Sequence, residues 1–297
     1  MFLKNVIKVF RKSFCLVLMI NCVFISDLSA QTTTFSSNEF DTSSYDSLKR
    51  KRIIEKGFDE PEKKYDIRIV PYSYSGNYKA VVYIPRKLKN LPVVIYSYDQ
   101  FLDLAGRELA LKKGYDLEAF LKAFGEWDMI CIIPLERNHK LNAVKGAIEY
   151  ATSLEQANKD DIHMVGVSEG AFLSLLSLDS FPGVKTVTII SPHMIHYTGR
   201  LSLPELARKI GKIKADVMLM IGQRENTWKI TISEIILSLF QQKGKHVRVK
   251  IFDKRKKWFW NPEHEFMSDI YEFITNKPFG AHQLKIDREM REKKWRE

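Results

Sequence analysis

Runs of apolar residues separated by polar turns recur along the chain between about residues 65 and 275. Alternation of apolar and polar residues at Tyr65–Val70 predicts a strand with one face toward solvent, whereas the nearly continuous apolar run Leu91–Tyr96 is typical of a strand buried on both faces. The predicted strands are Tyr65–Val70, Tyr78–Ile84, Leu91–Tyr96, Met129–Ile133, Ile162–Val167, Thr186–Ile190, Val217–Ile221 and Val247–Phe252, of which we expect the last six to be buried.

Segments with helical periodicity lie between these strands, near residues 104–124, 141–157, 169–178, 203–211, 230–243 and 265–275. Strands that alternate with helices form parallel sheets through crossover connections. The pattern therefore predicts an α/β fold with a mostly parallel central sheet, antiparallel strands at its start and helices on both faces. We assign this domain to residues 61–278 and expect the charged tail, residues 279–297, to be a solvated helix or a docking arm.

The first thirty residues differ from the rest of the chain. Four cations precede an apolar run of about 13 residues from Ser13 to Ile25, and the small residues Ser29 and Ala30 follow. The run is shorter than the roughly 17–25 residues that span a bilayer. Residues 1–30 therefore predict a cleaved signal peptide and export to the periplasm or the exterior, with an uncleaved signal that anchors the protein to the membrane as the alternative.

The segment of residues 31–60 is polar and then basic. Its first part is rich in Ser, Thr, Asp and Asn and has too little apolar surface to form a core, so we interpret it as a tether. The cationic tetrad Lys49–Arg52 follows, and a solvated face is its simplest interpretation.

Composition narrows the function classes. The chain has 297 residues with 45% apolar and 28% charged residues, which suits one large globular domain. Its three cysteines, at positions 15, 22 and 131, have neither the number nor the spacing for a disulfide framework or a zinc site. The formal charge of +11 would fall to +8 on loss of the leader, and basicity in an exported protein favours anionic membrane surfaces over nucleic acid as partners.

One pentapeptide stands out as a candidate for chemistry. Gly166-Val167-Ser168-Glu169-Gly170 lies where a buried strand ends and an amphipathic helix begins. A G-x-S-x-G sequence in this context predicts a sharp turn that presents the Ser168 hydroxyl, with glycines where strand and helix approach closely. An ordinary strand-to-helix turn is the alternative interpretation.

On this motif and its flanks the chain resembles the α/β-hydrolase superfamily, in particular its compact esterase and dienelactone-hydrolase-like members, over about Tyr65–Thr275. The resemblance implies the order nucleophile, acid, histidine, with Ser168 as nucleophile. It places Glu225, in Gly222-Gln223-Arg224-Glu225, at the acid position and His264, after the last strand, at the position of the base. It implies neither a cofactor nor a metal.

Alternatives remain for two members of this triad. Asp253 or Glu263 could replace Glu225 as the acid, and Glu225 could be a solvated loop residue. His264 could simply solvate the start of the last helix. The other histidines are less suitably placed: His163 lies within a strand, His139 precedes a helix on the earlier side of the sheet, His246 precedes the last strand, and His193 and His196 could line a pocket.

The chain departs from the family at the oxyanion hole, the pair of backbone N–H groups that binds the negative oxygen of the intermediate. The family has His-Gly after the third strand, and this chain has Tyr98-Asp99-Gln100. We expect Glu169 and Gln100 to donate the two backbone N–H groups. An inward-facing Asp99 carboxylate would oppose the developing charge.

Two further segments are expected near the site. Lys254–Lys257 runs into Trp258-Phe259-Trp260 just before His264, and such a basic, aromatic loop could bind an anionic substrate or rest on a membrane surface, or could be merely solvated. The segment Asp99–Trp127 is the candidate pocket wall, through Arg107, Glu108, Tyr115 and Trp127.

The sequence thus predicts an exported serine hydrolase that cleaves a small or lipid-like carboxylic ester or thioester through an acyl-enzyme on Ser168. A catalytically degenerate binding protein with the same fold and a peptidase of the prolyl-oligopeptidase type are the alternatives, although the chain lacks the β-propeller domain of the latter.

Overall fold

A computed structural model describes residues 65–86, 88–112, 115–135, 140–194, 201–252 and 266–277. All the described residues belong to one unit of the chain, residues 46–297. The predicted signal peptide, the tether and the charged tail from residue 279 lie outside the described residues.

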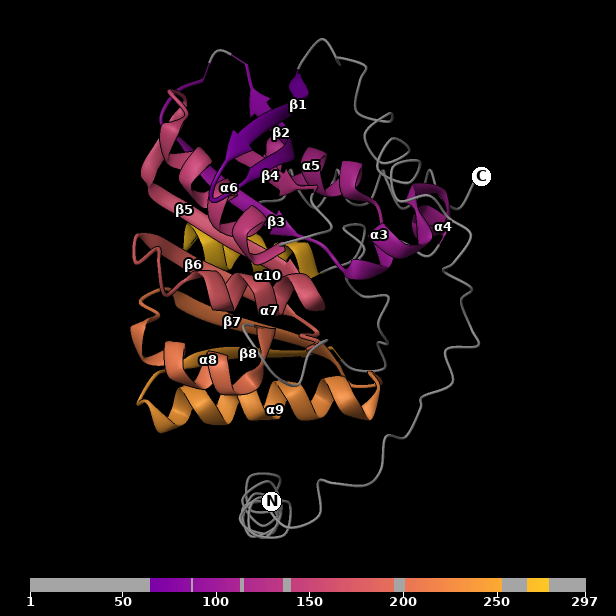
Figure 1. The fold of residues 1–297 in the computed structure, drawn as a ribbon, viewed down its shortest axis with the longest axis vertical. Coiled ribbons are helices and arrows are strands. Elements are labelled where there is room, and N and C mark those ends of the chain that lie inside the picture. Colours follow the sequence, from indigo (N-terminus) through magenta and orange to yellow (C-terminus); the bar gives the residue numbers. More distant parts are fainter. Residues whose placement is uncertain are drawn as a thin grey trace, which may run out of the picture. The chain divides into compact units, whose positions relative to one another are not determined.

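An eight-stranded sheet with the order β1-β2-β4-β3-β5-β6-β7-β8 forms the centre of this unit (Figure 1). Strand β2 pairs antiparallel with both β1 and β4, and every other pairing is parallel. The strands are β1 (Tyr65–Ser73), β2 (Asn77–Pro85), β3 (Leu91–Ser97), β4 (Ile130–Pro134), β5 (Ala157–Val167), β6 (Val184–Ile190), β7 (Asp216–Gly222) and β8 (Val247–Phe252). The predicted fold class is confirmed.

Helices cover both faces of the sheet, and each face has its own apolar core. One core joins the sheet to α6 (Lys140–Ser153), α7 (Glu169–Ser177), α8 (Leu203–Lys209), the 3-10 turn η2 (Ile210–Lys212) and α9 (Thr227–Gln242). The other joins it to α3 (Gln100–Ala105), α4 (Arg107–Lys112), α5 (Leu117–Glu126) and α10 (Phe266–Thr275). Strands β3, β4, β6 and β7 are therefore covered on both sides, which explains their continuous Val and Ile runs.

The structure corrects one predicted helix. Residues 104–124 form parts of three helices, α3, α4 and α5, instead of one. Gly106 ends α3 with a φ of 81°, and the Asp116 carboxylate accepts a hydrogen bond from the Ala119 amide at 3.0 Å to begin α5. The helical periodicity persisted across both breaks because all three helices pack on the same core.

Strand β8 corrects a second prediction, because it is not buried. It lies at the edge of the sheet, and Val249 and Ile251 are 43% and 58% exposed. Its cations lie on the other face, where Lys250 pairs with Asp269 at 2.8 Å and Arg248 lies over the Phe273 ring. Arg248 and Lys250 alternate with aliphatic residues along β8, and this alternation was the signal that separates it from strands buried on both faces.

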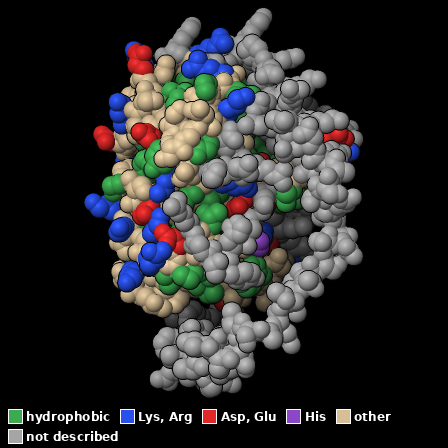
Figure 2. Space-filling view, in the orientation of Figure 1, with side chains coloured by type: hydrophobic (Ala, Val, Ile, Leu, Met, Phe, Trp, Pro, Cys, Tyr) green, Lys and Arg blue, Asp and Glu red, His purple; other side chains and the backbone are tan. Residues whose placement is uncertain are grey.

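The described surface carries both signs of charge. Basic and acidic side chains are interspersed over the described part of the face seen in Figure 2. Within the described ranges, no helix has the length and apolar character that crossing a membrane requires, and no cluster of His, Cys, Asp and Glu side chains could hold a metal ion.

Cys131 is a buried free thiol, and burial raises its pKa well above the ordinary value.

His163 is a buried histidine of β5, in the strand interior as predicted. Its Nδ1 lies 2.9 Å from the Thr186 hydroxyl and its Nε2 lies 3.2 Å from the Asp161 carboxylate. Burial lowers the pKa of His163 from 6.5 to about 4, against the opposing effect of Asp161. The imidazole is therefore neutral in the folded protein at pH 7.

We expect His163 to make stability depend on pH. Because its pKa in the folded state lies below that in the unfolded chain, protons bind preferentially to the unfolded chain as the pH falls from 6.5 to 4. Over that range the free energy of unfolding of the parent should fall by on the order of 3 kcal/mol more than that of His163→Gln. Urea titrations of both proteins between pH 4 and 7 measure the difference, and parallel pH profiles would contradict it.

Candidate active site

Ser168 occupies a strained turn between β5 and α7. Its φ of 55° and ψ of −115° lie in a region that residues other than glycine rarely adopt. Two backbone hydrogen bonds hold it there: the Ser168 amide donates to the Ile190 carbonyl at 2.9 Å, and the Ser168 carbonyl accepts from the His193 amide at 3.0 Å. The turn predicted from the pentapeptide is present, and it is fixed by the segment that follows β6.

The two glycines of the pentapeptide allow close backbone contact. A Cβ atom at Gly166 would lie 2.5 Å from the Gly170 carbonyl oxygen. One at Gly170 would lie 2.0 Å from the Ser97 carbonyl oxygen and 2.7 Å from that of Tyr98. The contact at Gly166 is the predicted close approach of β5 and α7, whereas the contact at Gly170 places the start of α7 directly against the end of β3, which was not predicted.

Glu225 is buried at the carboxyl ends of the parallel strands, where Ser168 also lies. It follows β7 with 7% of its surface exposed, and its Oε1 accepts a hydrogen bond from the Ser191 hydroxyl at 2.8 Å. The Lys229 ammonium lies 4.0 Å from the same oxygen. Glu225 is thus an oriented, buried carboxylate and not a solvated loop residue.

The two predicted oxyanion donors, Glu169 and Gln100, each begin a helix at the carboxyl ends of the parallel strands. Glu169 and Gln100 are the first residues of α7 and α3, and the N–H groups in the first turn of a helix have no acceptor within that helix. The contact of Gly170 with Ser97 and Tyr98 brings the starts of these helices together. This placement suits the predicted pair of oxyanion donors.

The Asp99 carboxylate accepts hydrogen bonds from a backbone amide and from a phenol. Its Oδ1 accepts a hydrogen bond from the Phe101 amide at 2.7 Å and so caps α3. Burial, followed by the charges of Asp99 and Glu225, raises the pKa of Tyr115 well above its ordinary value, and this phenol also hydrogen-bonds to Asp99. Burial and the nearby Lys229 cation lower the pKa of His193, while Asp99 opposes them. These side chains therefore share one electrostatic environment beside Ser168.

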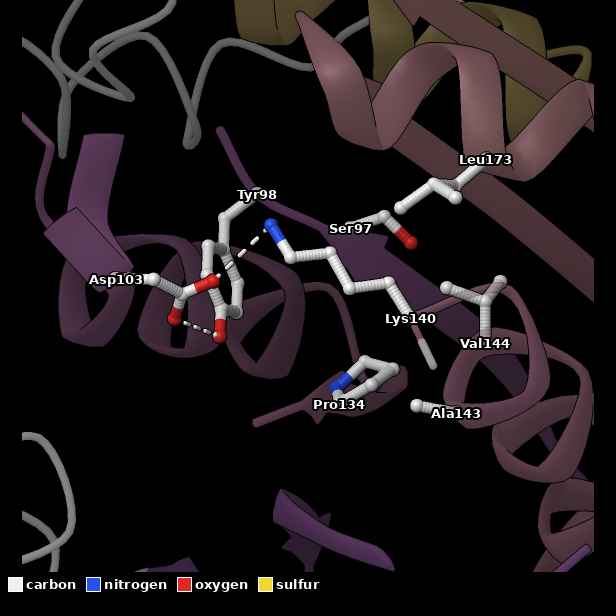
Figure 3. Close-up of a pocket in the computed structure, with 8 residues that line it drawn as sticks. All are labelled: Ser97, Tyr98, Asp103, Pro134, Lys140, Ala143, Val144 and Leu173. Carbon is white, nitrogen blue, oxygen red and sulfur yellow. Dashed lines mark hydrogen bonds and ion pairs between the residues drawn. The ribbon is translucent and has the colours of Figure 1, made fainter. Parts of the chain in front are cut away.

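An ionic network of Lys140, Glu169, Asp103 and Tyr98 lies at the start of α7, and Figure 3 shows Lys140, Asp103 and Tyr98. The Lys140 ammonium lies 2.5 Å from the Glu169 carboxylate and 3.2 Å from that of Asp103, and the Tyr98 hydroxyl donates to Asp103 at 2.9 Å. A cavity of about 20 Å³ adjoins the network, enough for about one water molecule and too small for a substrate.

Three predictions fall on parts of the chain that the structure does not describe. His264 and the alternative acids Asp253 and Glu263 lie outside the described residues, as do the basic, aromatic loop of residues 254–260 and the histidines at 139 and 196. The structure brings Ser168, Glu225 and the Glu169 and Gln100 amides to one edge of the sheet. The place of the base in this arrangement stays a prediction.

The predicted pocket wall is wrong for Glu108 and Trp127. The side chain of Arg107 lies outside the described part of the chain, and Tyr115 as a wall residue stays a prediction. Glu108 is exposed and pairs with Lys112 at 3.0 Å. Trp127 packs edge-on against Phe124 and Tyr271 where the chain enters β4, at the edge of the sheet opposite Ser168. Their aromatic and charged character did not indicate which edge of the sheet they occupy.

Sequence reasoning missed three residues of the site, Ser191, Lys229 and Lys140, and the contact of Tyr98 with Asp103. One available signal was that Ser191 directly follows a buried strand, as Ser168 does, so both lie at the carboxyl edge of the parallel sheet. No comparable pattern marked Lys140, whose partners come from two distant helices.

Comparison with solved structures identifies the fold. Pyrococcus horikoshii acylaminoacyl peptidase matches with a TM-score of 0.58 at 13% identity, over 74% of this chain and 43% of that one. Esterase Est22 matches with a TM-score of 0.57 at 11% identity, over 75% and 85% of the two chains. Porphyromonas gingivalis dipeptidyl peptidase 4 matches with a TM-score of 0.56 at 11% identity, over 72% of this chain and 36% of that one.

The chain has the α/β-hydrolase fold. It spans less than half the length of the two peptidases but most of the length of the esterase. Its sequence matches no protein-family model and no curated protein. The hydrolase fold is therefore recognised from the strand order and the turn at Ser168, at identities too low to transfer an activity.

We expect this hydrolase fold to depend on Gly170. Gly170→Ala would drive a methyl group into the backbone of Ser97 and should lower the free energy of unfolding by about 1–3 kcal/mol. Gly211→Ala is the matched control, since a Cβ atom there meets nothing within 4 Å. Denaturant unfolding of both variants measures the effect, and equal stability would contradict the close approach.

Proposed function

We propose that this protein is an exported serine hydrolase that cleaves a carboxylic ester or thioester through an acyl-enzyme on Ser168. The observation that supports it most is the strained Ser168 turn at the edge of the sheet that also holds the buried Glu225 carboxylate. Export rests on the sequence of residues 1–30 alone.

In the proposed mechanism, the Ser168 hydroxyl attacks the carbonyl carbon of the substrate while His264 removes its proton. Glu225 orients the His264 imidazole and stabilises its cation. The Glu169 and Gln100 amides donate hydrogen bonds to the oxyanion, and His264 then protonates the leaving alcohol or thiol. Water, activated by His264, releases the acid and regenerates Ser168.

Ser191 would position the acid in this mechanism. Its hydroxyl donates a hydrogen bond to Oε1 of Glu225 at 2.8 Å and so orients the carboxylate. Oε2 is then left to accept a hydrogen bond from the imidazole. Ser191 is itself held, because its amide donates to the Met220 carbonyl at 2.9 Å.

The substrate in this proposal is a small-molecule or lipid-like ester. The cations Lys254–Lys257 and the aromatic residues that follow favour an anionic membrane surface as a second partner, because such segments bind acidic interfaces. A degenerate binding protein is the second candidate, favoured by Asp99 at a position where a family member has a residue of its oxyanion hole.

An active-site probe distinguishes these two candidates. A fluorophosphonate should label the parent protein, and Ser168→Ala should abolish labelling because it removes the nucleophilic oxygen. Ser177→Ala is the control: it removes another buried hydroxyl of α7, away from the turn, and should be labelled like the parent. A parent that is folded and unlabelled would favour the binding protein, and labelling of Ser168→Ala would reject Ser168 as nucleophile.

The role of Glu225 is tested through Ser191. Ser191→Ala removes a hydrogen bond to a charged group and should lower kcat on a short-chain ester about 10-fold with little change in KM. Ser233→Ala, which removes a buried hydroxyl bonded to the Lys229 carbonyl, is the control and should retain kcat. An unchanged kcat in Ser191→Ala, with loss on replacement of Asp253 or Glu263, would move the acid to one of those residues.

A further inference from the structure

The two proposed oxyanion donors belong to segments that leave the sheet in different directions. Backbone pairing of β3 with β5 ends at Ser97 and Gly166, before either donor is reached. Beyond that point α3 carries Gln100 and α7 carries Glu169. The distance between two amides that must meet one oxygen atom therefore depends on contacts outside the sheet.

The ammonium of Lys140 joins these two helices. Lys140 begins α6, and its side chain is 13% exposed. Its Nζ lies 2.5 Å from Glu169 of α7 and 3.2 Å from Asp103 of α3. In Figure 3 the side chain extends from α6 past Ser97 and places its nitrogen on the α3 side, near Asp103.

The charge of Lys140 compensates two carboxylates that would otherwise repel each other. The side chains of Asp103 and Glu169 are 4% and 8% exposed. Burial raises the pKa of Glu169, Lys140 opposes this shift, and Asp103 and Asp99 add to it. Removing one member of a buried ionic group leaves an uncompensated charge, and the structure relaxes to avoid it.

We propose that Lys140 is a positioning residue for the oxyanion hole, which holds α3 and α7 together through Asp103 and Glu169 and thereby fixes the Gln100 and Glu169 amides relative to each other. This inference rests on the proposed function. Lys140 touches neither the nucleophile nor the substrate in this role. Lys140 therefore stabilises the transition state, in which the two amides bind the oxyanion, and does not contribute to the binding of substrate.

Lys140→Met tests the proposal on the full-length mature protein. We expect kcat on a short-chain ester to fall about 10²-fold with KM within about threefold of the parent, because displacement of donors by about 1 Å has effects of this size. Affinity for an aryl boronic acid, whose tetrahedral adduct places an oxygen in the oxyanion hole, should fall in parallel with kcat.

The matched control is Lys145→Met. Lys145 lies on the same helix with the same 13% exposure and pairs with Asp179 at 3.5 Å, beyond the end of α7 farther from Ser168. This variant should lose stability without loss of kcat or of boronate affinity. Equal losses in the two lysine variants would assign Lys140 a general structural role and overturn the proposal.

A charge-neutral variant covers the case in which Lys140→Met does not fold. The triple variant Lys140→Met, Asp103→Asn, Glu169→Gln buries no charge in the network, so it should fold. Its kcat should be at least 5-fold higher than that of Lys140→Met. If Lys140→Met is insoluble, the kcat of the triple variant should exceed 5% of the parental kcat. Failure of the triple variant to recover would mean that Lys140 acts other than by compensating these carboxylates, and would overturn the proposal.

The outcomes separate this inference from the proposed function. A parent protein without turnover and without fluorophosphonate labelling would reject the hydrolase proposal itself. An active parent whose kcat and boronate affinity are unchanged by Lys140→Met would reject the inference alone.

Discussion

Contact between Gly170 and the carbonyl oxygens at the end of β3 sets the geometry of this edge of the protein. Because the helix that follows Ser168 begins without a side chain at its second residue, it approaches β3 at backbone distance. That approach brings the starts of α7 and α3 together. It also encloses the side chains between them, so that Glu169 and Asp103 are buried and Lys140 is only 13% exposed.

Burial of charge is the cost of this arrangement. Asp103, Glu169, Glu225 and Lys229 are all buried, and each loses hydration that its partners must replace. An apolar group of the same size would serve stability equally well or better. The retention of charged groups here is consistent with a site that needs fixed dipoles and carboxylates, as in the proposed hydrolase, and less with a purely structural edge of the sheet.

Much of the fold followed from the sequence because the hydrophobic runs of β3, β4, β6 and β7 report burial on both faces. The Ser168 turn was predictable for a different reason, since its two glycines and its flanks leave few alternatives. Residues 104–124 were harder, because one apolar face continues across two helix breaks. The edge strand β8 differs from the central strands in sequence, because Arg248 and Lys250 alternate with its aliphatic residues, and the prediction of a buried strand overlooked this alternation.

The sequence predicted those site residues whose position follows from the order of the strands along the chain. Glu225 and Ser168 each follow a parallel strand, so topology alone places them at one edge. The contacts of Glu225 with Ser191 and of Lys140 with two helices depend on side-chain packing between distant segments, and no local pattern encodes them. Trp127 shows the converse: a residue close to the predicted pocket in sequence lies at the opposite edge of the sheet.

Strand β8 has a consequence for self-association. Its backbone edge is open to pairing among the described residues, and Val249 and Ile251 add exposed apolar surface. Arg248 and Lys250 alternate with them along the strand. If the β8 edges of two copies met as an antiparallel ladder, their cations would be brought close to one another, which disfavours the pairing. The alternation of cation and aliphatic residue thus acts as protection against edge-to-edge aggregation.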